Sequence, residues 1–521
     1  MRSSRTLAVT GALAAFTLLC VLPLAYMLAQ AGTAAATHAV LLLDARQRTL
    51  LLNTAALGGG TALLATLIGA PLGFVLARVP LRFKPVWRVA LAAPLLLPPY
   101  VIALAWVYLG GSAGLVAAAT GRDLLSGWTY SLPGAVVVLS LVFYPLSMLT
   151  TEVALRRIEP RIEEAAFVVA PPGRVLRRIT LPLAAPAVGA AALVIFVLAV
   201  SEFGVPGLLR VRVFTTEVFT AFAALYDFSR ATILTLPLLG LSIVVAAVAA
   251  LLVGERLLVT RRGATGARPV AFEGWTRRAT GAAWCVLAVA LVAPLAVLTR
   301  EAMGVPSVTA IVKGSGEAIR SSLTLAAAGA TVASGVAVWI GYARARARRR
   351  VGVCADVLLV VLFAVPSTVV GVGLIGVWNR AGVFGRVYGT DGMLLLAYLA
   401  RFLPVAALAL AAGMRYVPAS HEEAAAVGGA GWWSTMIHVV LPQVKLALLA
   451  AWVVVFILAF GELGASILVA PPGESTLPIR IYTIIANAPA AEVAALALLQ
   501  TAVVLAPLSL LALGIAIRRP E

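Results

Sequence analysis

The chain has 521 residues, of which 62% are hydrophobic and only 12% are charged. A soluble domain has about 45–50% apolar residues and about 25% charged residues, so this composition excludes an ordinary water-soluble protein and an intrinsically disordered one. The net charge is +19, and the positions of the charges decide whether they favour a nucleic acid or a membrane.

Twelve apolar runs are each long enough to cross a hydrocarbon core of about 30 Å as a helix. In chain order they lie near residues 7 to 29, 50 to 77, 88 to 110, 133 to 155, 184 to 207, 232 to 254, 279 to 299, 321 to 343, 354 to 377, 393 to 414, 446 to 469 and 491 to 516. The sequence therefore predicts an all-α integral membrane protein with about twelve transmembrane helices.

The Lys and Arg residues lie mostly on one side of these spans. Numbering the loops alternately from an inside N-terminus places 27 of the 40 inside, 12 outside and one, Arg401, within a span. The positive-inside rule then predicts a multi-pass protein with both termini in the cytoplasm. The basicity reflects this orientation, with attraction to anionic membrane lipid as a second effect, and we expect no nucleic-acid partner.

Six short motifs of the first half recur in the same order in the second half, at offsets of 271, 268, 268, 259, 259 and 260 residues. The pairs are LPLA and APLA, GFVLAR and GYARAR, LPPYV and VPSTV, FYPLS and FLPVA, EEAA and EEAA, and SEFG and GELG. Each half holds six spans, so the repeats have the same orientation and a pseudo-twofold axis along the membrane normal. We expect a first transmembrane domain at 1–260, a cytoplasmic linker at 261–278 and a second domain at 279–521.

Two long cytoplasmic loops stand at equivalent places in the halves. Residues 163–182 read EEAAFVVAPPGRVLRRITLP, and residues 422–442 read EEAAAVGGAGWWSTMIHVVLP. Carboxylates and alanines favour a short helix, glycine allows a turn, and Leu-Pro marks entry into the next span. We expect each loop to form an exposed helix-turn-helix that docks on another protein.

The sequence lacks the common motifs of an enzyme. No lysine is preceded by glycine, as a Walker A motif requires, so the chain is not expected to hydrolyse ATP. The histidines are scattered, at His38, His421 and His438, and no metal or other cofactor is assigned to the chain.

Residues Glu423 to Pro442 resemble the EAA loop of binding-protein-dependent ABC importer permeases, with Glu-Ala-Ala, Gly429, Trp433 and Leu-Pro. The resemblance implies a type I ABC importer-like fold of two fused permease domains in a bacterial inner (plasma) membrane. It also implies two copies of a cytoplasmic ABC ATPase, which bind ATP and Mg, and a periplasmic substrate-binding protein. In that family the loop forms the coupling helix that contacts the ATPase.

The coupling residues that this resemblance implies come from both loops. They are Glu163, Glu164, Ala165, Ala166, Gly173, Leu181 and Pro182 in the first, and Glu422, Glu423, Ala424, Ala425, Gly429, Trp433, Leu441 and Pro442 in the second. The first loop departs from the motif, because Ala170 takes the place of the glycine and two prolines follow it. We therefore predict that the first loop has a different turn and couples more weakly.

The segments SEFG and GELG after these loops look most like those of ferric-iron permeases. Fused permeases for thiamine, phosphonate or another small solute share the layout and remain alternatives. A twelve-span secondary transporter is a further alternative, but it should carry central titratable residues for ion coupling, and the only strongly intramembrane charge is Arg401.

Five residues are candidates for the translocation pathway or a gate: Glu202, Gly204, Arg401, Glu462 and Gly464. Carboxylates within a span indicate function by default, and a repeated pair would suit a trivalent cation. The alternative is that Glu202 and Glu462 are helix-end carboxylates that face water. Arg401 either lines the pathway or makes a structural contact between helices.

Overall fold

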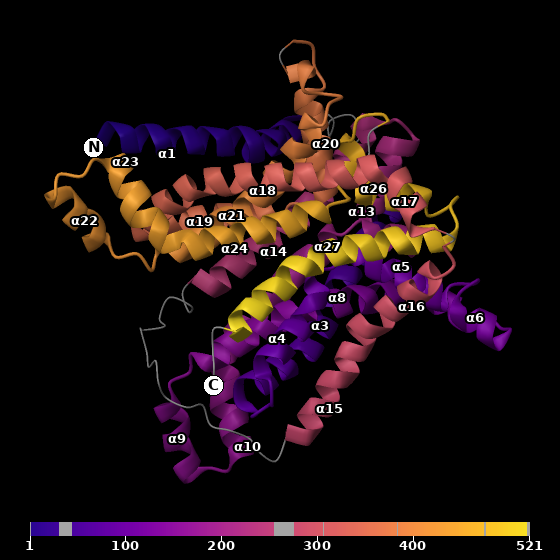
Figure 1. The fold of residues 1–521 in the computed structure, drawn as a ribbon, viewed down its shortest axis with the longest axis horizontal. Helices are drawn as coiled ribbons and strands as arrows, with labels where there is room; N and C mark the ends of the chain where they lie inside the picture. Colours follow the sequence, from indigo (N-terminus) through magenta and orange to yellow (C-terminus); the bar gives the residue numbers. More distant parts are fainter. Residues whose placement is uncertain are drawn as a thin grey trace. The chain divides into compact units, whose positions relative to one another are not determined.

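The computed structural model describes residues 2–30, 44–254, 276–305, 307–382, 384–473 and 476–517. Every regular element within these residues is a helix (Figure 1), which confirms the predicted all-α class. Residues 261–275 of the predicted linker lie outside the described residues, and residues 276–278 begin α15 (Thr276–Leu287).

Ten helices within the described residues are long and apolar enough to cross a membrane. They lie at Thr6–Gln30, Ala45–Arg78, Pro99–Thr120, Leu132–Arg156, Pro172–Ser201, Phe228–Val245, Thr276–Ala302, Gly316–Ala345, Gly392–Met414 and Trp432–Phe460. A bent pair, Arg350–Ala364 with Ser367–Trp378, is an eleventh candidate. The last predicted span corresponds to α27 (Ala490–Ile517), so each of the twelve predicted spans coincides with a helix or a helix pair.

Contacts divide the chain into two compact units. Unit 1 comprises residues 1–47, 217–243 and 309–486. Its elements are α1 (Arg2–Phe16), η1 (Thr17–Val21), η4 (Thr220–Ala224), the first part of α14 (Phe228–Gly254), α17 (Val308–Gly314), α18 (Gly316–Ala345), α19 (Arg349–Ala364), α20 (Ser367–Trp378), η8 (Phe384–Arg386), α21 (Gly392–Met414), α22 (Ala419–Val427), α23 (Trp432–Thr435), η9 (Met436–Val440), α24 (Leu441–Phe460), α25 (Ser466–Val469) and α26 (Leu477–Ile484).

Unit 2 comprises residues 48–216, 244–308 and 487–521. Its elements are α3 (Ala45–Arg78), α4 (Lys84–Ala92), η2 (Ala93–Leu96), α5 (Pro99–Gly110), α6 (Leu115–Thr120), α7 (Ser126–Thr129), α8 (Leu132–Arg156), α9 (Pro160–Val169), α10 (Pro172–Val175), η3 (Leu176–Thr180), α11 (Leu181–Ser201), α12 (Gly204–Leu208), α13 (Phe214–Phe219), α15, η7 (Ala288–Val292), α16 (Ala293–Ala302) and α27.

The units are not the two sequence halves, because each unit includes helices from both halves. In unit 1 the N-terminal helix α1 packs against α18, and η1 packs against α21. In unit 2 the second-half helix α16 packs against α5 and α27. The domain boundaries that the repeat predicts remain a prediction. The contacts show in addition that helices are exchanged between the two sequence halves.

One span in each half is broken at an equivalent proline. The residue before a proline is pushed out of the α region, and both Leu97 (ψ 137°) and Val365 (ψ 127°) are extended. The chain bends by 93° between α19 and α20. A hydrogen bond reaches a carbonyl near each break: Tyr144 donates to Leu91 at 2.8 Å, and Arg401 donates to Val365 at 3.1 Å.

Wide π-helical turns also repeat in both halves. The pairs η1 and η7, and η3 and η9, keep the same offsets as the sequence motifs, and a proline follows each of the four turns within two residues. Because proline lacks an N–H and its ring clashes with the carbonyl four residues earlier, a widened turn lets the helix continue past it. The Leu-Pro pairs Leu181-Pro182 and Leu441-Pro442 therefore begin α11 and α24 without breaking the helix.

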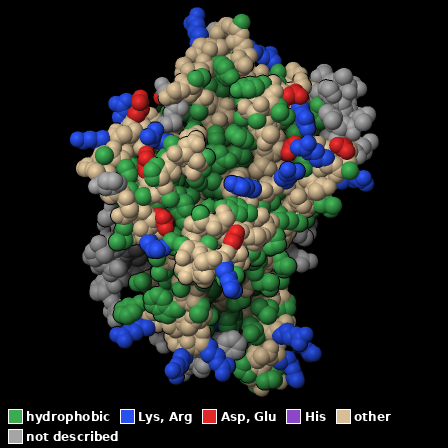
Figure 2. Space-filling model, turned by 90° about the vertical axis from the view of Figure 1, so that its right-hand side faces the viewer, with side chains coloured by type: hydrophobic (Ala, Val, Ile, Leu, Met, Phe, Trp, Pro, Cys, Tyr) green, Lys and Arg blue, Asp and Glu red, His purple; other side chains and the backbone are tan. Residues whose placement is uncertain are grey.

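Glycines let two helices of each unit approach closely. A Cβ at Gly73 of α3 would lie 2.4 Å from a carbonyl oxygen of α8, and one at Gly341 of α18 would lie 2.9 Å from a backbone nitrogen of α21. These glycines are repeat-related and stand five residues before Arg78 and Arg346. Broad areas of hydrophobic side chains cover the face drawn in Figure 2, as expected for helices in contact with lipid.

Candidate functional site

The first loop forms two short helices joined by an extended turn. Pro160 stands at the first position of α9, where a missing N–H costs nothing. The helix ends at Ala170, which is extended (φ −146°, ψ 146°) before Pro171, and α10 begins at Pro172. The predicted helix-turn-helix is present, and Ala170 does not adopt a left-handed turn. Gly173 lies in α10 with open space around it.

The second loop makes its turn with a glycine in the left-handed region. Helix α22 ends at Gly428, and Gly429 follows with φ +81°. The N–H of Gly429 donates to the carbonyl of Ala426 at 3.0 Å, and that of Ala430 donates to Ala425 at 2.9 Å. These two bonds form a Schellman motif. The predicted difference between the two turns is therefore present in the structure.

The first helix of each loop, α9 or α22, presents both a carboxylate and an apolar side chain to solvent. Glu164 and Glu423 are exposed, and so are Ala165 and Ala424. Val168 and Val427, which are equivalent in the repeat, are 85% and 91% exposed. In contrast, Ala166 and Ala425 are half-buried on the inner side of their helices.

The other glutamate of the first loop points inward. Glu163 forms an ion pair with Arg78, the last residue of α3, at 2.9 Å, and both side chains are almost fully buried (3% and 2% exposed). The hydroxyl of Thr180 donates to Glu163 at 2.7 Å. Arg78 Nη2 also donates to the carbonyl of Leu155 in the last turn of α8, at 2.9 Å. The buried charge is therefore paired, as a buried carboxylate must be.

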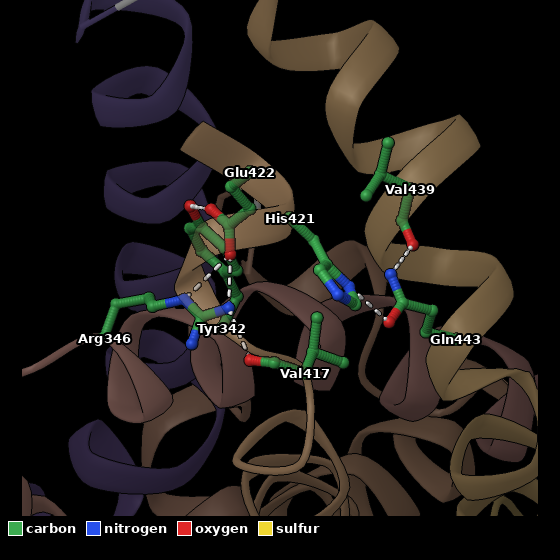
Figure 3. Close-up of polar contacts among 7 residues, drawn as sticks. All are labelled: Tyr342, Arg346, Val417, His421, Glu422, Val439 and Gln443. Carbon is green, nitrogen blue, oxygen red and sulfur yellow. Dashed lines mark hydrogen bonds and ion pairs between the residues drawn. The ribbon is translucent and has the colours of Figure 1, made fainter. Parts of the chain in front are cut away.

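Glu422 makes the equivalent contact in the second loop, as Figure 3 shows. Arg346, at the end of α18, donates from Nε to Glu422 at 2.8 Å and also contacts it through Nη2. The hydroxyl of Tyr342 donates to the other carboxylate oxygen at 2.7 Å, and Arg346 Nη2 donates to the carbonyl of Val417 at 3.1 Å. His421 lies 3.0 Å from Gln443 of α24, which adds a second tie between α22 and the following span.

The two arginines are site residues that the sequence reasoning missed. Their signal was the repeated motif GFVLAR and GYARAR, whose final arginines are Arg78 and Arg346. Trp433, a predicted coupling residue, is half exposed and packs edge-on against Trp432 and Trp339, with ring centroids 4.8 and 5.4 Å apart. It therefore also holds the loop against its own helix bundle.

Glu202 and Glu462 accept backbone hydrogen bonds at the start of short helices. Glu462 is buried and accepts from the N–H groups of Ala465 and Ser466, both at 2.9 Å, at the start of α25. Glu202 accepts from the N–H of Gly204 at 2.9 Å, at the start of α12. These contacts favour the helix-end interpretation of both carboxylates, because a negative charge is stabilised at a helix N-terminus. The expectation that the carboxylates face water is wrong for Glu462, which is only 6% exposed. Gly464 is buried in the turn after Glu462, and the predicted role of these residues in a gate stays a prediction.

Arg401 donates to the carbonyl of Val365. This carbonyl lies at the end of α19, where the ninth span is broken. A cation at a helix C-terminus interacts favourably with the helix dipole. The contact joins α21 to α19, as the structural interpretation of this residue predicts. Within the described residues, no group of three or more His, Cys, Asp or Glu side chains could hold a metal ion.

Comparison with known proteins finds a family profile that includes the second loop. The profile of the family described as binding-protein-dependent transport system inner membrane component matches residues 333–517, which include the second loop. A ferric transport system permease protein of Actinobacillus pleuropneumoniae is 25% identical over 79% of this chain and 63% of its own length. An Fe(3+)-transport system permease protein of Haemophilus influenzae is 24% identical over 88% of this chain and 89% of its own length.

A molybdenum transport system permease protein of Mycobacterium bovis is 34% identical, over 30% of this chain and 60% of its own length. Together with the family profile, these relatives confirm the resemblance found in the sequence. Residues 333–517 therefore match inner-membrane components of binding-protein-dependent transport systems, and most of the chain is similar to ferric permeases of this type.

Proposed function

We propose that this permease is the membrane-spanning subunit of an ATP-driven importer that moves ferric iron from a periplasmic binding protein to the cytoplasm by alternating access. Two copies of a cytoplasmic ABC ATPase would bind ATP and Mg and dock on the two loops. The observation that carries the proposal is the exposed helix-turn-helix in each unit. An ion pair between an Arg and a Glu joins each of these loops to the end of a span.

The exposed faces of the loops have the composition of a docking surface. Burying a valine side chain contributes about 1.5–3 kcal/mol relative to leaving it in water, and Val168 and Val427 are exposed almost completely. Each stands about one helical turn after an exposed glutamate, Glu164 or Glu423. An apolar groove with a nearby cation on the ATPase would satisfy both groups.

Ferric iron is favoured as substrate because the two ferric permeases resemble the chain over 79% and 88% of its length. The molybdenum permease resembles it over 30%. Thiamine, phosphonate and molybdate are the alternatives that share the importer role. A secondary transporter is the alternative outside this class.

Uptake of labelled ferric iron by iron-limited cells tests the substrate. We expect uptake to fall when the chain is deleted and to return with the wild-type chain but not with Glu423→Ala. Uptake that is indifferent to deletion would contradict ferric iron as the substrate. The same cells, assayed with thiamine, a phosphonate and molybdate, then distinguish the alternatives.

Co-purification tests the importer class independently of the substrate. We expect the chain to co-purify in detergent with a nucleotide-binding subunit, and we expect transport to depend on ATP. Transport by the chain alone in proteoliposomes, driven by an ion gradient, would instead indicate a secondary transporter.

A further inference from the structure

The Arg–Glu contacts beneath the coupling helices are equivalent in the two halves. Arg78 and Arg346 lie 268 residues apart, which is the offset of the motif that contains them, and Glu163 and Glu422 lie 259 residues apart. Arg78 is the last residue of α3 and Arg346 directly follows α18, which are the second spans of their halves, and each glutamate lies in the first turn of a coupling helix. The same pair therefore joins the same two elements twice.

Each arginine also binds a third element, because its guanidinium offers several donors in a fixed planar fork. Arg78 donates to the carbonyl of Leu155 in α8, and Arg346 donates to the carbonyl of Val417 just after α21. In the predicted orientation, these carbonyls lie at the cytoplasmic end of the fourth span of each half. One side chain thus connects the coupling helix with the ends of two spans.

The surroundings of the two contacts differ. Arg78 and Glu163 are almost completely buried, whereas the side chains of Arg346 and Glu422 are 17% and 18% exposed. The second contact is therefore open to substitution with less risk to folding, since a buried charge left without its partner is strongly destabilising.

We propose that Arg78 and Arg346 are positioning residues that transmit movement of the coupling helices to the spans. The proposed role of the two arginines rests on the proposed importer function. It identifies the residues that couple the ATPase to the transmembrane helices. Because each arginine fixes the coupling helix to the ends of two spans, a displacement imposed by the ATPase moves those ends instead of bending the loop. Without the arginine, the ATPase still docks on the exposed face, but its cycle no longer follows the state of the transmembrane helices.

The test measures ATP hydrolysis by the complex of the full chain with its ATPase subunits in proteoliposomes, with and without the loaded binding protein. We expect Arg346→Met to keep the co-purified ATPase and the basal rate, while the ratio of stimulated to basal hydrolysis falls at least fivefold towards one. A purely structural loss would lower assembly and basal rate together. The matched control is Arg344→Met, two residues earlier, because Arg344 contacts Asp356 and not the coupling loop.

Stimulation of Arg346→Met at the wild-type ratio would overturn the proposal, and so would an equal loss in Arg344→Met. If Arg346→Met does not assemble, Arg346→Lys keeps the charge but not the fork. We then expect an assembled complex with a reduced ratio, and a wild-type ratio would overturn the proposal. A wild-type complex without bound ATPase would instead contradict the proposed function, so the two failures are distinguishable.

Discussion

Replacing Gly429 with alanine should weaken binding of the ATPase through backbone conformation alone. Gly429 has φ +81°, and an added Cβ would meet no atom within 4 Å. A residue with a Cβ pays about 1–2 kcal/mol in the left-handed region. Since about 1.4 kcal/mol is a tenfold change in affinity, we expect the apparent affinity for the ATPase to fall by up to about tenfold.

Titrating the purified permease in detergent with its ATPase subunit measures this affinity. Gly429→Asn should bind more tightly than Gly429→Ala, because asparagine tolerates positive φ better than alanine. Gly431→Ala is the matched control, since Gly431 has φ −67° and also has open space around it. In the first loop, Gly173→Ala should be neutral or slightly stabilising, because alanine is favoured over glycine in a helix.

Equal affinities for Gly429→Ala and Gly431→Ala would refute this reasoning. Such a result would mean that residue 429 does not have to adopt a positive φ when the ATPase is bound. A loss in Gly429→Ala that Gly429→Asn does not lessen would likewise point to a cause other than φ.

Three further predictions concern the loops and the orientation. At equal assembly, Glu423→Ala should lower substrate-stimulated ATPase activity and transport more than Glu164→Ala does, because the second loop keeps the glycine turn; equal losses would show that the loops are equivalent. Val427→Asp should reduce co-purification of the ATPase severalfold without lowering the amount of chain in the membrane, because the side chain is exposed; wild-type co-purification would place the docking surface elsewhere. In a background without native cysteines, an impermeant thiol reagent applied to intact cells should label Ser126→Cys and not Ser420→Cys, and the reverse pattern would invert the predicted topology.

The sequence predicted the spans and the helix-turn-helix conformation of the two loops because both depend on local signals. An apolar run of sufficient length becomes a helix in lipid wherever it lies, since its backbone has no other way to satisfy its hydrogen bonds. The turns depend on the φ angles that single residues allow. Gly429 and Ala170 therefore showed in advance that the two turns differ.

The roles of neighbouring carboxylates depend on tertiary structure. Glu422 and Glu423 look alike in sequence, but one contacts Arg346 and the other is exposed. Which of them points inward depends on how α22 lies against the end of α18, and no local pattern determines this. The role of Glu462 was likewise ambiguous in the sequence. Its hydrogen bonds to Ala465 and Ser466 require an interruption of the helix, which hydrophobicity does not reveal.

The exchange of helices between the sequence halves has a consequence for biosynthesis. Helix α1 emerges from the ribosome first, but its packing partner α18 begins only at Gly316. At about 5–20 residues per second, synthesis of the intervening chain takes roughly 15–60 s. During that time the first span lacks its partner α18, so lipid or the insertion machinery has to cover that face, and a nascent chain that stalls in the first half would leave the span without this partner.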